Sequence, residues 1–284
     1  MAITNFVPEI WSARIWEQLQ TGLVYGGPGV INRDYEGDIE NAGDTVHITS
    51  FSDPTIRAYT VETDITVDAI TDADRALVVD QADYFAFDVD DVNKRQALKG
   101  WVDNRIRRSG YLLAKDSDAY IAAAMYAALN NTAYDIGAVT ADISDNTAYA
   151  NVFVALWTSM TEGDVPVDGR WVIVDPDLYA ALLTDARFID ASASGSTDAL
   201  RNGFVGRIAG FDIYVSNQTP DPTSGVSAVI AGHPMATTYA EQINSIEAQR
   251  RELRFGDIVK GLHLYGAKVV HPEAMRLMSV TVQA

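Results

Sequence analysis

The feature that most constrains the fold is a single apolar stripe through residues 92–130. Its members recur at spacings of three and four residues or their sums, the period of a helix with one buried face. At about 1.5 Å per residue, such a helix is on the order of 55 Å long. Residues 92–130 are therefore predicted to form one long helix. The stripe consists of Leu98, Val102, Ile106, Leu113, Ile121, Met125 and Leu129.

Basic residues gather in the first half of this helix, although the whole chain has a formal net charge of −18. The overall acidity argues against a nucleic-acid reader, because phosphate binding needs a positive surface. The local bias indicates a face directed at carboxylates or phosphates. The alternative is a solvated face with ion pairs to Asp103 and Asp116. The basic residues are Lys94, Arg95, Lys99, Arg105, Arg107, Arg108 and Lys115.

Residues 1–43, which precede these elements, have the pattern of an arm rather than of a packed domain. A short helix with an apolar stripe at Trp11, Ile15 and Leu19 is followed by a turn or hinge, GGPG, at 26–29. One short helix cannot bury its own stripe. The arm therefore needs a partner surface, either elsewhere in the chain or on a neighbouring molecule.

Residues 44–91 have the alternating pattern of β-strands, with apolar runs that begin at Val46, Leu77 and Phe85. Between the first two runs lies a polar stretch, 60–74, that is rich in Thr and Asp. An isolated hairpin is marginally stable in water. We therefore expect this long β-hairpin, the β excursion, to pack against another surface.

Residues 131–235 combine helix and strand signals. The apolar run 171–174 is typical of a buried strand, and Asp175-Pro176 then starts a helix with a capping residue and a proline. Residues 236–284 return to the alternation of strands. Further predictions are a helix from about Thr147 to Thr161, strands within 204–215 and 226–231, and loops at 190–198 and 217–225.

Searches for chemical motifs exclude several classes of site. The chain has no cysteine, no Gly-Lys pair of a phosphate loop and no nucleophile elbow, and its four histidines lack the spacing of a zinc site. We expect no catalytic, cofactor-binding or metal-binding residues. No apolar stretch reaches the ~18 residues that span a bilayer, and the first residues lack the pattern of a signal peptide. A soluble protein with no membrane partner is expected.

Four stretches carry a resemblance to a known family. The order of arm, β excursion, long helix, α/β block and terminal strands resembles the major capsid fold of tailed bacteriophages, which encapsulins and herpesvirus shells share. The stretches are similar to capsid proteins of actinobacterial and related siphophages. They are NRDYEGDIENAGDTVHI at 32–48, VPVDGRWVIVDPDLY at 165–179, GRIAGFDIYVSN at 206–217 and GLHLYGAKVVHPEA at 261–274.

The resemblance implies an α+β fold and a structural, non-enzymatic subunit. Such subunits assemble into the hexamers and pentamers of an icosahedral shell around phage double-stranded DNA. The implied location is the virion capsid, with assembly in the host cytoplasm. The implied divisions are an N-terminal arm (1–43), an extended β loop (44–91), the spine helix of a peripheral domain (92–130), an axial domain (131–235) and C-terminal strands of the axial and peripheral domains (236–284).

The resemblance also implies the partners. In this family the arm and the extended loop reach neighbouring subunits, so the chain itself is the main partner. The arm begins at residue 1, which favours a separate scaffolding protein over a fused one. The portal and non-specifically held DNA complete the expected partners. Candidate intersubunit contacts are Trp11, Ile15, Leu19, Arg57 and Arg75.

Some capsids of this fold are locked by isopeptide bonds between a loop lysine and a neighbour's asparagine. This chain has no lysine in residues 1–93 and no cysteine, so we expect a non-covalent shell. Two alternatives stay open. An encapsulin-like compartment would share the fold, whereas a hydrolase with a β-rich substrate domain would need a convergent polar site.

Overall fold

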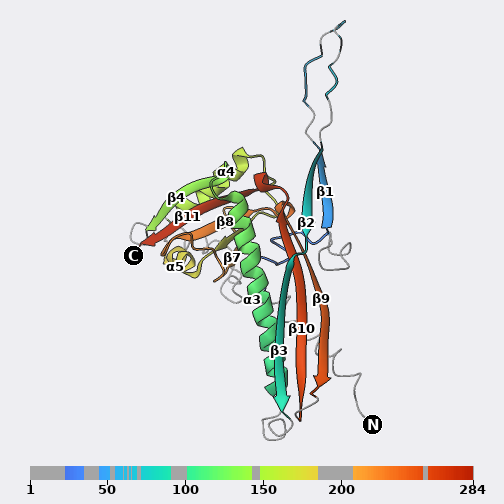
Figure 1. The fold of residues 1–284 in the computed structure, drawn as a ribbon. Coiled ribbons are helices and arrows are strands. Elements are labelled where there is room, and N and C mark those ends of the chain that lie inside the picture. Colours follow the sequence, from blue (N-terminus) through green and yellow to red (C-terminus); the bar gives the residue numbers. More distant parts are fainter. Residues whose placement is uncertain are drawn as a thin grey trace.

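The computed structural model describes three sheets, of two, three and six strands, and the helices that pack on them (Figure 1). A long helix, α3 (Trp101–Leu129), runs beside the three-stranded sheet and reaches the six-stranded one. The described residues are 23–34, 45–51, 55–59, 61–62, 64, 66–68, 72–90, 101–142, 148–184, 207–251 and 255–283.

The three-stranded sheet is antiparallel and consists of β3 (Gln81–Asp90), β10 (Gly256–Val269) and β9 (Thr237–Arg250), in the order β3-β10-β9. Alternate β3 side chains, such as Phe87 and Val89, are buried on one face. α3 packs on this sheet and on the six-stranded one, and the described members of its apolar stripe, from Ile106 to Leu129, are buried. The predicted helix is thus confirmed from residue 101 onward, and its predicted start at 92 lies outside the described residues.

The six-stranded sheet is mixed, in the order β4-β11-β8-β5-β7-β6. β11 pairs in parallel with β4, and β5 with β7, whereas the other neighbours are antiparallel. The strands are β4 (Asp135–Asp142), β5 (Trp171–Val174), β6 (Arg207–Ile208), β7 (Phe211–Val215), β8 (Ser227–Gly232) and β11 (Met275–Gln283).

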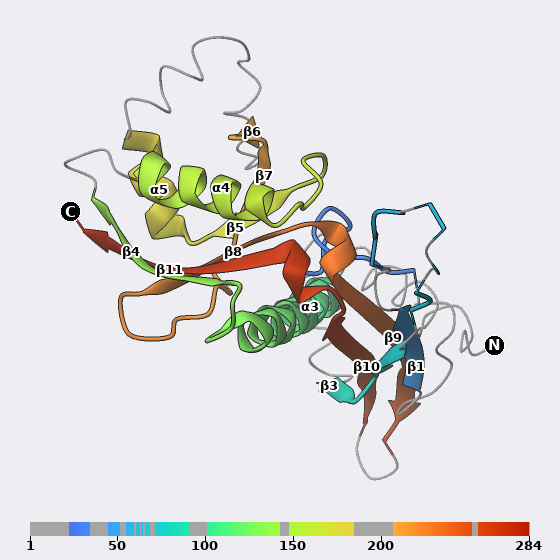
Figure 2. The same ribbon diagram turned by 90° about the horizontal axis from the view of Figure 1, so that it is seen from above.

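Helices cover both faces of this sheet. Figure 2 shows α4 (Ala155–Glu162) and α5 (Pro176–Thr184) on one side and the end of α3 on the other. A π-helical stretch, η2 (Tyr149–Val154), leads into α4, so the helix predicted at about 147–161 is present. One apolar core joins both faces and continues to the three-stranded sheet through Tyr239 and Tyr265.

Local sequence explains why these elements begin and end where they do. All four residues of β5 are buried, as expected for an apolar strand inside a sheet. α5 then starts at Pro176, where a missing amide hydrogen costs nothing, and Tyr179 donates to the carbonyl of Asp175 at 3.0 Å. Between β6 and β7, Ala209 and Gly210 both have positive φ, the conformation of a tight hairpin turn.

The predicted excursion at 44–91 divides into two parts. β1 (Thr45–Phe51) and β2 (Asp72–Val78) pair with each other and project beyond both larger sheets (Figure 1). β3 instead pairs with β10, because its alternate apolar side chains are buried beneath α3. The projecting ribbon is held at its base by an apolar cluster that includes Ile48, Leu77 and Leu264.

Candidate assembly surfaces

The described residues at the end of the projecting ribbon, 55–59, 61–62, 64 and 66–68, are called the loop tip below. Its described apolar side chains are exposed to an unusual degree: Ile56 is 97% exposed, Val67 83% and Val61 77%. Tyr59 is 71% exposed. Large apolar side chains in a folded subunit are normally buried at least in part. Exposed apolar side chains gathered on one projection are typical of a contact surface for another molecule.

An ion pair braces the loop tip. Arg57 Nη2 lies 2.7 Å from Asp68 Oδ1, and the amide of Thr55 donates to Asp68 Oδ2 at 3.1 Å. The hydrogen bond from Arg57, followed by that from the Thr55 amide, lowers the pKa of Asp68. The ion pair links the outgoing and returning segments of the loop, and because both side chains are exposed it contributes only about 0–1 kcal/mol.

The structure places the predicted contact residues as follows. Arg57 is in the loop tip, and Arg75 is half-buried on β2, opposite Ile48 of β1. Trp11, Ile15 and Leu19 lie outside the described residues. The two arginines are on the same projection, but they are not brought together. Their intersubunit pairing stays a prediction.

A second exposed surface lies on the first half of α3. Arg105, Arg107, Arg108 and Lys115 are exposed there, together with Tyr111 and Leu112. These six residues are called the basic helix face below. The guanidinium of Arg108 lies 5.1 Å from the ring centroid of Tyr111, which keeps charge and aromatic surface adjacent. No ion pair joins the four cations to a carboxylate within the part of the chain that the structure describes.

The root of the predicted arm is bound to its own subunit. Asp118 of α3 is 2% exposed, and its Oδ1 accepts hydrogen bonds from the amides of Gly26 at 2.9 Å and Val24 at 3.1 Å. Burial raises the pKa of Asp118 to about 6, although these amide hydrogen bonds oppose the shift. Tyr25 and Val30 are fully buried beside them. The GGPG segment is therefore a turn that begins at the buried Gly26, whereas Pro28 and Gly29 are exposed.

A buried polar network fixes the same segment to β9 and β10. Arg33 Nη1 lies 2.7 Å from Glu241 Oε1, and Tyr239 donates to Glu241 Oε2 at 2.9 Å. His263 Nε2 lies 3.2 Å from the same oxygen, and its side chain is fully buried. Burial acts to raise the pKa of Glu241, but His263 and Arg33 outweigh it and the pKa is lowered. Sequence reasoning missed this network because its members are far apart in the chain.

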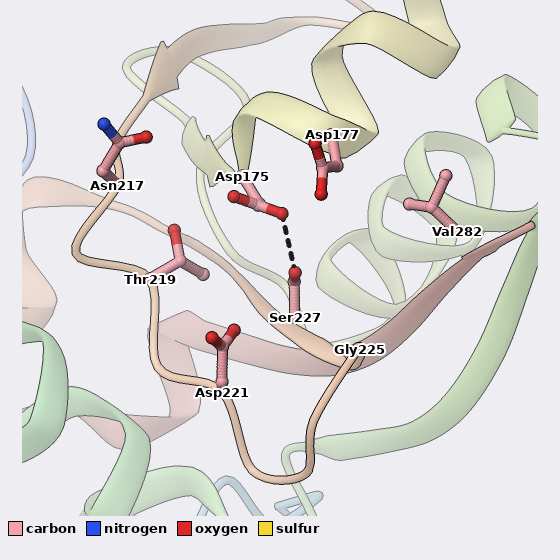
Figure 3. A pocket seen from close by; sticks show the side chains of 8 residues that line it. All are labelled: Asp175, Asp177, Asn217, Thr219, Asp221, Gly225, Ser227 and Val282. Carbon is pink, nitrogen blue, oxygen red and sulfur yellow. Dashed lines mark hydrogen bonds between the residues drawn. The ribbon is translucent and has the colours of Figure 1, made fainter.

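The described part of the six-stranded unit also contains an acidic recess of about 310 Å³ (Figure 3). Asp175 and Asp177 from the start of α5 face Asp221 of the predicted axial loop 217–225 across it. Ser227 donates to Asp175 Oδ2 at 2.9 Å. Burial first, and then the charges of Asp177 and Asp221, raise the pKa of Asp175.

The recess is not arranged as a metal centre. Among the described residues, no group of three or more His, Asp or Glu side chains is placed to hold a metal ion. The other predicted axial loop, 190–198, lies outside those residues. None of the described helices is long and apolar enough to cross a membrane.

Solved structures define the class of this fold. A structure from Mycobacterium phage Che8 has 29% sequence identity and a TM-score of 0.71, and the match covers 90% of each chain. The capsid of cyanophage P-SCSP1u shares the fold at 16% identity and a TM-score of 0.66, over 86% of this chain and 85% of that one. The fold is therefore that of a phage shell protein. No curated protein matches the sequence.

The family follows from the sequence itself. The profile described as "Phage capsid protein" matches residues 73–277, which is more than two thirds of the chain. The chain belongs to the phage capsid protein family, and it is a major capsid subunit of a tailed phage, located in the virion. Family and fold imply a structural protein rather than an enzyme. The expected α+β capsid fold is confirmed.

The encapsulin-like alternative has less support. A virus-like particle from Pyrococcus furiosus matches with a TM-score of 0.61, over 96% of this chain and 99% of that one, but at 12% identity. Similarity at that level shows the fold alone. The family profile and the 29% identity to the phage Che8 structure both favour a phage capsid.

Proposed function

We propose that this subunit forms the hexamers and pentamers of an icosahedral shell around double-stranded DNA. The observation that carries the proposal is the loop tip, whose apolar side chains are 71–97% exposed in the single chain; they are Ile56, Tyr59, Val61 and Val67. Burying a large apolar side chain stabilises a complex by roughly 1.5–3 kcal/mol. Contact with a neighbouring subunit supplies that burial.

The other contacts and partners are proposals of the same kind. Trp11, Ile15 and Leu19 form the apolar stripe of an arm that reaches a neighbour, and Arg57 and Arg75 meet carboxylates of adjacent subunits. A separate scaffolding protein and a portal act during assembly in the host cytoplasm. The DNA is held without sequence preference. The subunit itself carries out no reaction.

Assembly in a bacterial host tests the proposal. The chain is expressed alone and with a scaffolding protein from its own genome, and particles are examined by electron microscopy. We expect closed shells from the wild type and soluble subunits from I56S/V67S. V167S, which removes a 55% exposed valine outside the loop tip, is the control and should assemble. Normal shells from I56S/V67S, or none from the wild type under either condition, would contradict the proposal.

A further inference from the structure

The cations of the basic helix face are held differently from those in the rest of the subunit. Aromatic rings lie beside two of them: the guanidinium of Arg105 is 5.5 Å from the ring centroid of Phe87, and that of Arg108 is 5.1 Å from that of Tyr111. A ring orders a guanidinium without neutralising its charge. Several cations elsewhere form ion pairs with carboxylates of their own subunit, namely Arg33, Arg57, Arg207, Arg250, Arg251 and Lys260.

The basic helix face forms a row along α3. Arg105, Arg108 and Lys115 are separated by three and seven residues, so they lie on one side of the helix. Ile106 and Leu113 are buried on the opposite side, so the row points away from the subunit. Like charges three residues apart destabilise a helix. An anion that lies along the row removes this repulsion.

The rest of the chain is strongly acidic. Residues 94–115 contain seven of the 21 basic residues and one of the 39 carboxylates, so all other residues carry the remaining 14 cations and 38 carboxylates. Exposed charges more than about 8 Å apart are largely screened at physiological salt. A polyanion is therefore attracted by the basic helix face and repelled by the acidic remainder. A chain with a net charge of −18 can hold a polyanion at one place without adhering to it elsewhere.

We propose that the basic helix face contacts the phosphate backbone of the packaged double-stranded DNA, without sequence preference. The inference rests on the proposed shell function and names the surface that touches the genome. Arg105 and Lys115 are ten residues apart, a separation of about 15 Å along the helix axis. One strand of duplex DNA passes about four phosphates over that length. Four cations thus meet about four phosphates, in a contact that salt weakens and that lets the DNA leave.

The salt dependence of DNA binding tests the contact. The full-length subunit is titrated into a short labelled duplex of mixed sequence, and binding is followed by fluorescence anisotropy at several salt concentrations. Four phosphate contacts predict a slope of about −3.5 for the logarithm of the binding constant against that of the salt concentration. R107Q/R108Q should reduce the slope to about −2 and weaken binding at low salt by about tenfold or more. R107K/R108K retains the charges and should retain the slope.

A matched variant separates the basic helix face from net charge. R250Q/R251Q also removes two adjacent arginines, but these lie 3.2 Å from Asp257 Oδ1 and 3.3 Å from Asp88 Oδ2. Its slope should equal that of the wild type. Circular dichroism checks folding, and K115Q, a single change at the end of the row, should reduce the slope by about one. A wild-type slope near zero, no change in R107Q/R108Q and K115Q, or an equal change in R250Q/R251Q overturns the proposal.

Cross-linking in DNA-filled particles tests the contact in the assembled state. Trypsin cleaves after arginine and lysine, so it releases Tyr111 in the peptide Ser109–Lys115. Ultraviolet light should couple DNA to this peptide. Tyr84 is more exposed, at 76% against 43%, but it lies on the face of β3 opposite to the buried Phe87 and should not be coupled. Equal coupling of both tyrosines, coupling of Tyr84 alone, or coupling of neither overturns the proposal.

Shell formation separates this inference from the proposed function. R107Q/R108Q should form closed shells, because the contact is with DNA and not with another subunit. If the folded variant forms none while the wild type does, the face binds an acidic protein surface, so the DNA contact is wrong and the shell function stands. If the wild type forms no shells under any condition, the proposed function itself fails.

Discussion

Asp118 shows how one residue links the spine helix to the start of the chain. Its carboxyl is buried, yet it accepts hydrogen bonds from the amides of Val24 and Gly26. A buried carboxylate is stabilised by amide donors but penalised by loss of water. The pKa of about 6 shows that desolvation outweighs the amides. The folded subunit therefore binds a proton at Asp118 more tightly than the unfolded chain does.

The raised pKa of Asp118 determines the direction in which the stability of the subunit changes with pH. Because the folded pKa of Asp118 is about 6 and the ordinary value is 3.8, its contribution to stability is greatest below pH 4 and falls as pH rises to about 6. The loss is about 3 kcal/mol. We predict that D118N gains stability relative to the wild type over this range. Urea unfolding of both proteins between pH 4.5 and 7.5 measures the difference, and a constant difference would refute the prediction.

Arg33 and Glu241 give a second prediction for single residues. R33M leaves a buried carboxylate with Tyr239 and His263 only, and should destabilise the subunit by about 3 kcal/mol. E241Q removes the charge that Arg33 neutralises. The double variant should be more stable than the sum of the single losses predicts, with a coupling of about 1–3 kcal/mol. A double-mutant cycle by urea unfolding checks this, and additive losses would show that the pair is not coupled.

At the scale of elements, the N-terminal segment has two parts with different roles. Residues 23–34 belong to the core of their own subunit, through Tyr25, Val30 and Ile31. Residues 1–22 contain the predicted apolar stripe and lie outside the described residues. Residues 23–34 therefore stabilise their own subunit, and the predicted stripe of residues 1–22 is proposed to reach a neighbour.

Two deletions distinguish these roles. Deletion of residues 1–22 should leave the unfolding free energy of the subunit unchanged and abolish closed shells. Deletion of residues 1–34 should also destabilise the subunit, by at least about 4 kcal/mol, because three buried side chains are lost. Urea unfolding and electron microscopy provide the two measurements. Normal shells after the shorter deletion would show that the arm is dispensable.

Local patterns predicted those elements that depend on neighbouring residues. The helical stripe predicted α3, and the apolar run with Asp175-Pro176 predicted β5 and α5. Pairing between distant strands was not predictable in this way, which is why β3 was grouped with the excursion rather than with β10. The sequence of β4 has no clear alternation, and only one of its eight residues is buried, so no strand was predicted there.

The candidate surfaces were predictable to different degrees. Arg57 and the basic run on α3 stand out by charge alone, and the structure shows both to be exposed. The apolar loop residues, such as Ile56 and Val67, were not singled out from the sequence. Residues 60–74 were described only as a polar stretch, and the exposure of a side chain depends on what the fold brings near it. Asp118 looked like any other acid of the helix. Only the packing of residues 24–26 against it makes it buried.

At the scale of the whole molecule, the distribution of amines predicts how the shell is held together. The five lysines are Lys94, Lys99, Lys115, Lys260 and Lys268, so the projecting ribbon has no side-chain amine. Disulfides are excluded because there is no cysteine. Mature particles boiled in detergent should give one band near 31 kDa on a denaturing gel. A ladder of covalent multimers would refute non-covalent locking.

The position of β11 bears on how the subunit is made. Residues 275–283 lie between β4 and β8, so β4 has no partner strand in the six-stranded sheet until they have been synthesised. Translation proceeds at about 5–20 residues per second, and earlier segments wait as partly folded intermediates. The loop tip is synthesised more than 200 residues before that strand. A nascent chain therefore exposes the apolar side chains of its loop tip before β11 has joined β4 to β8.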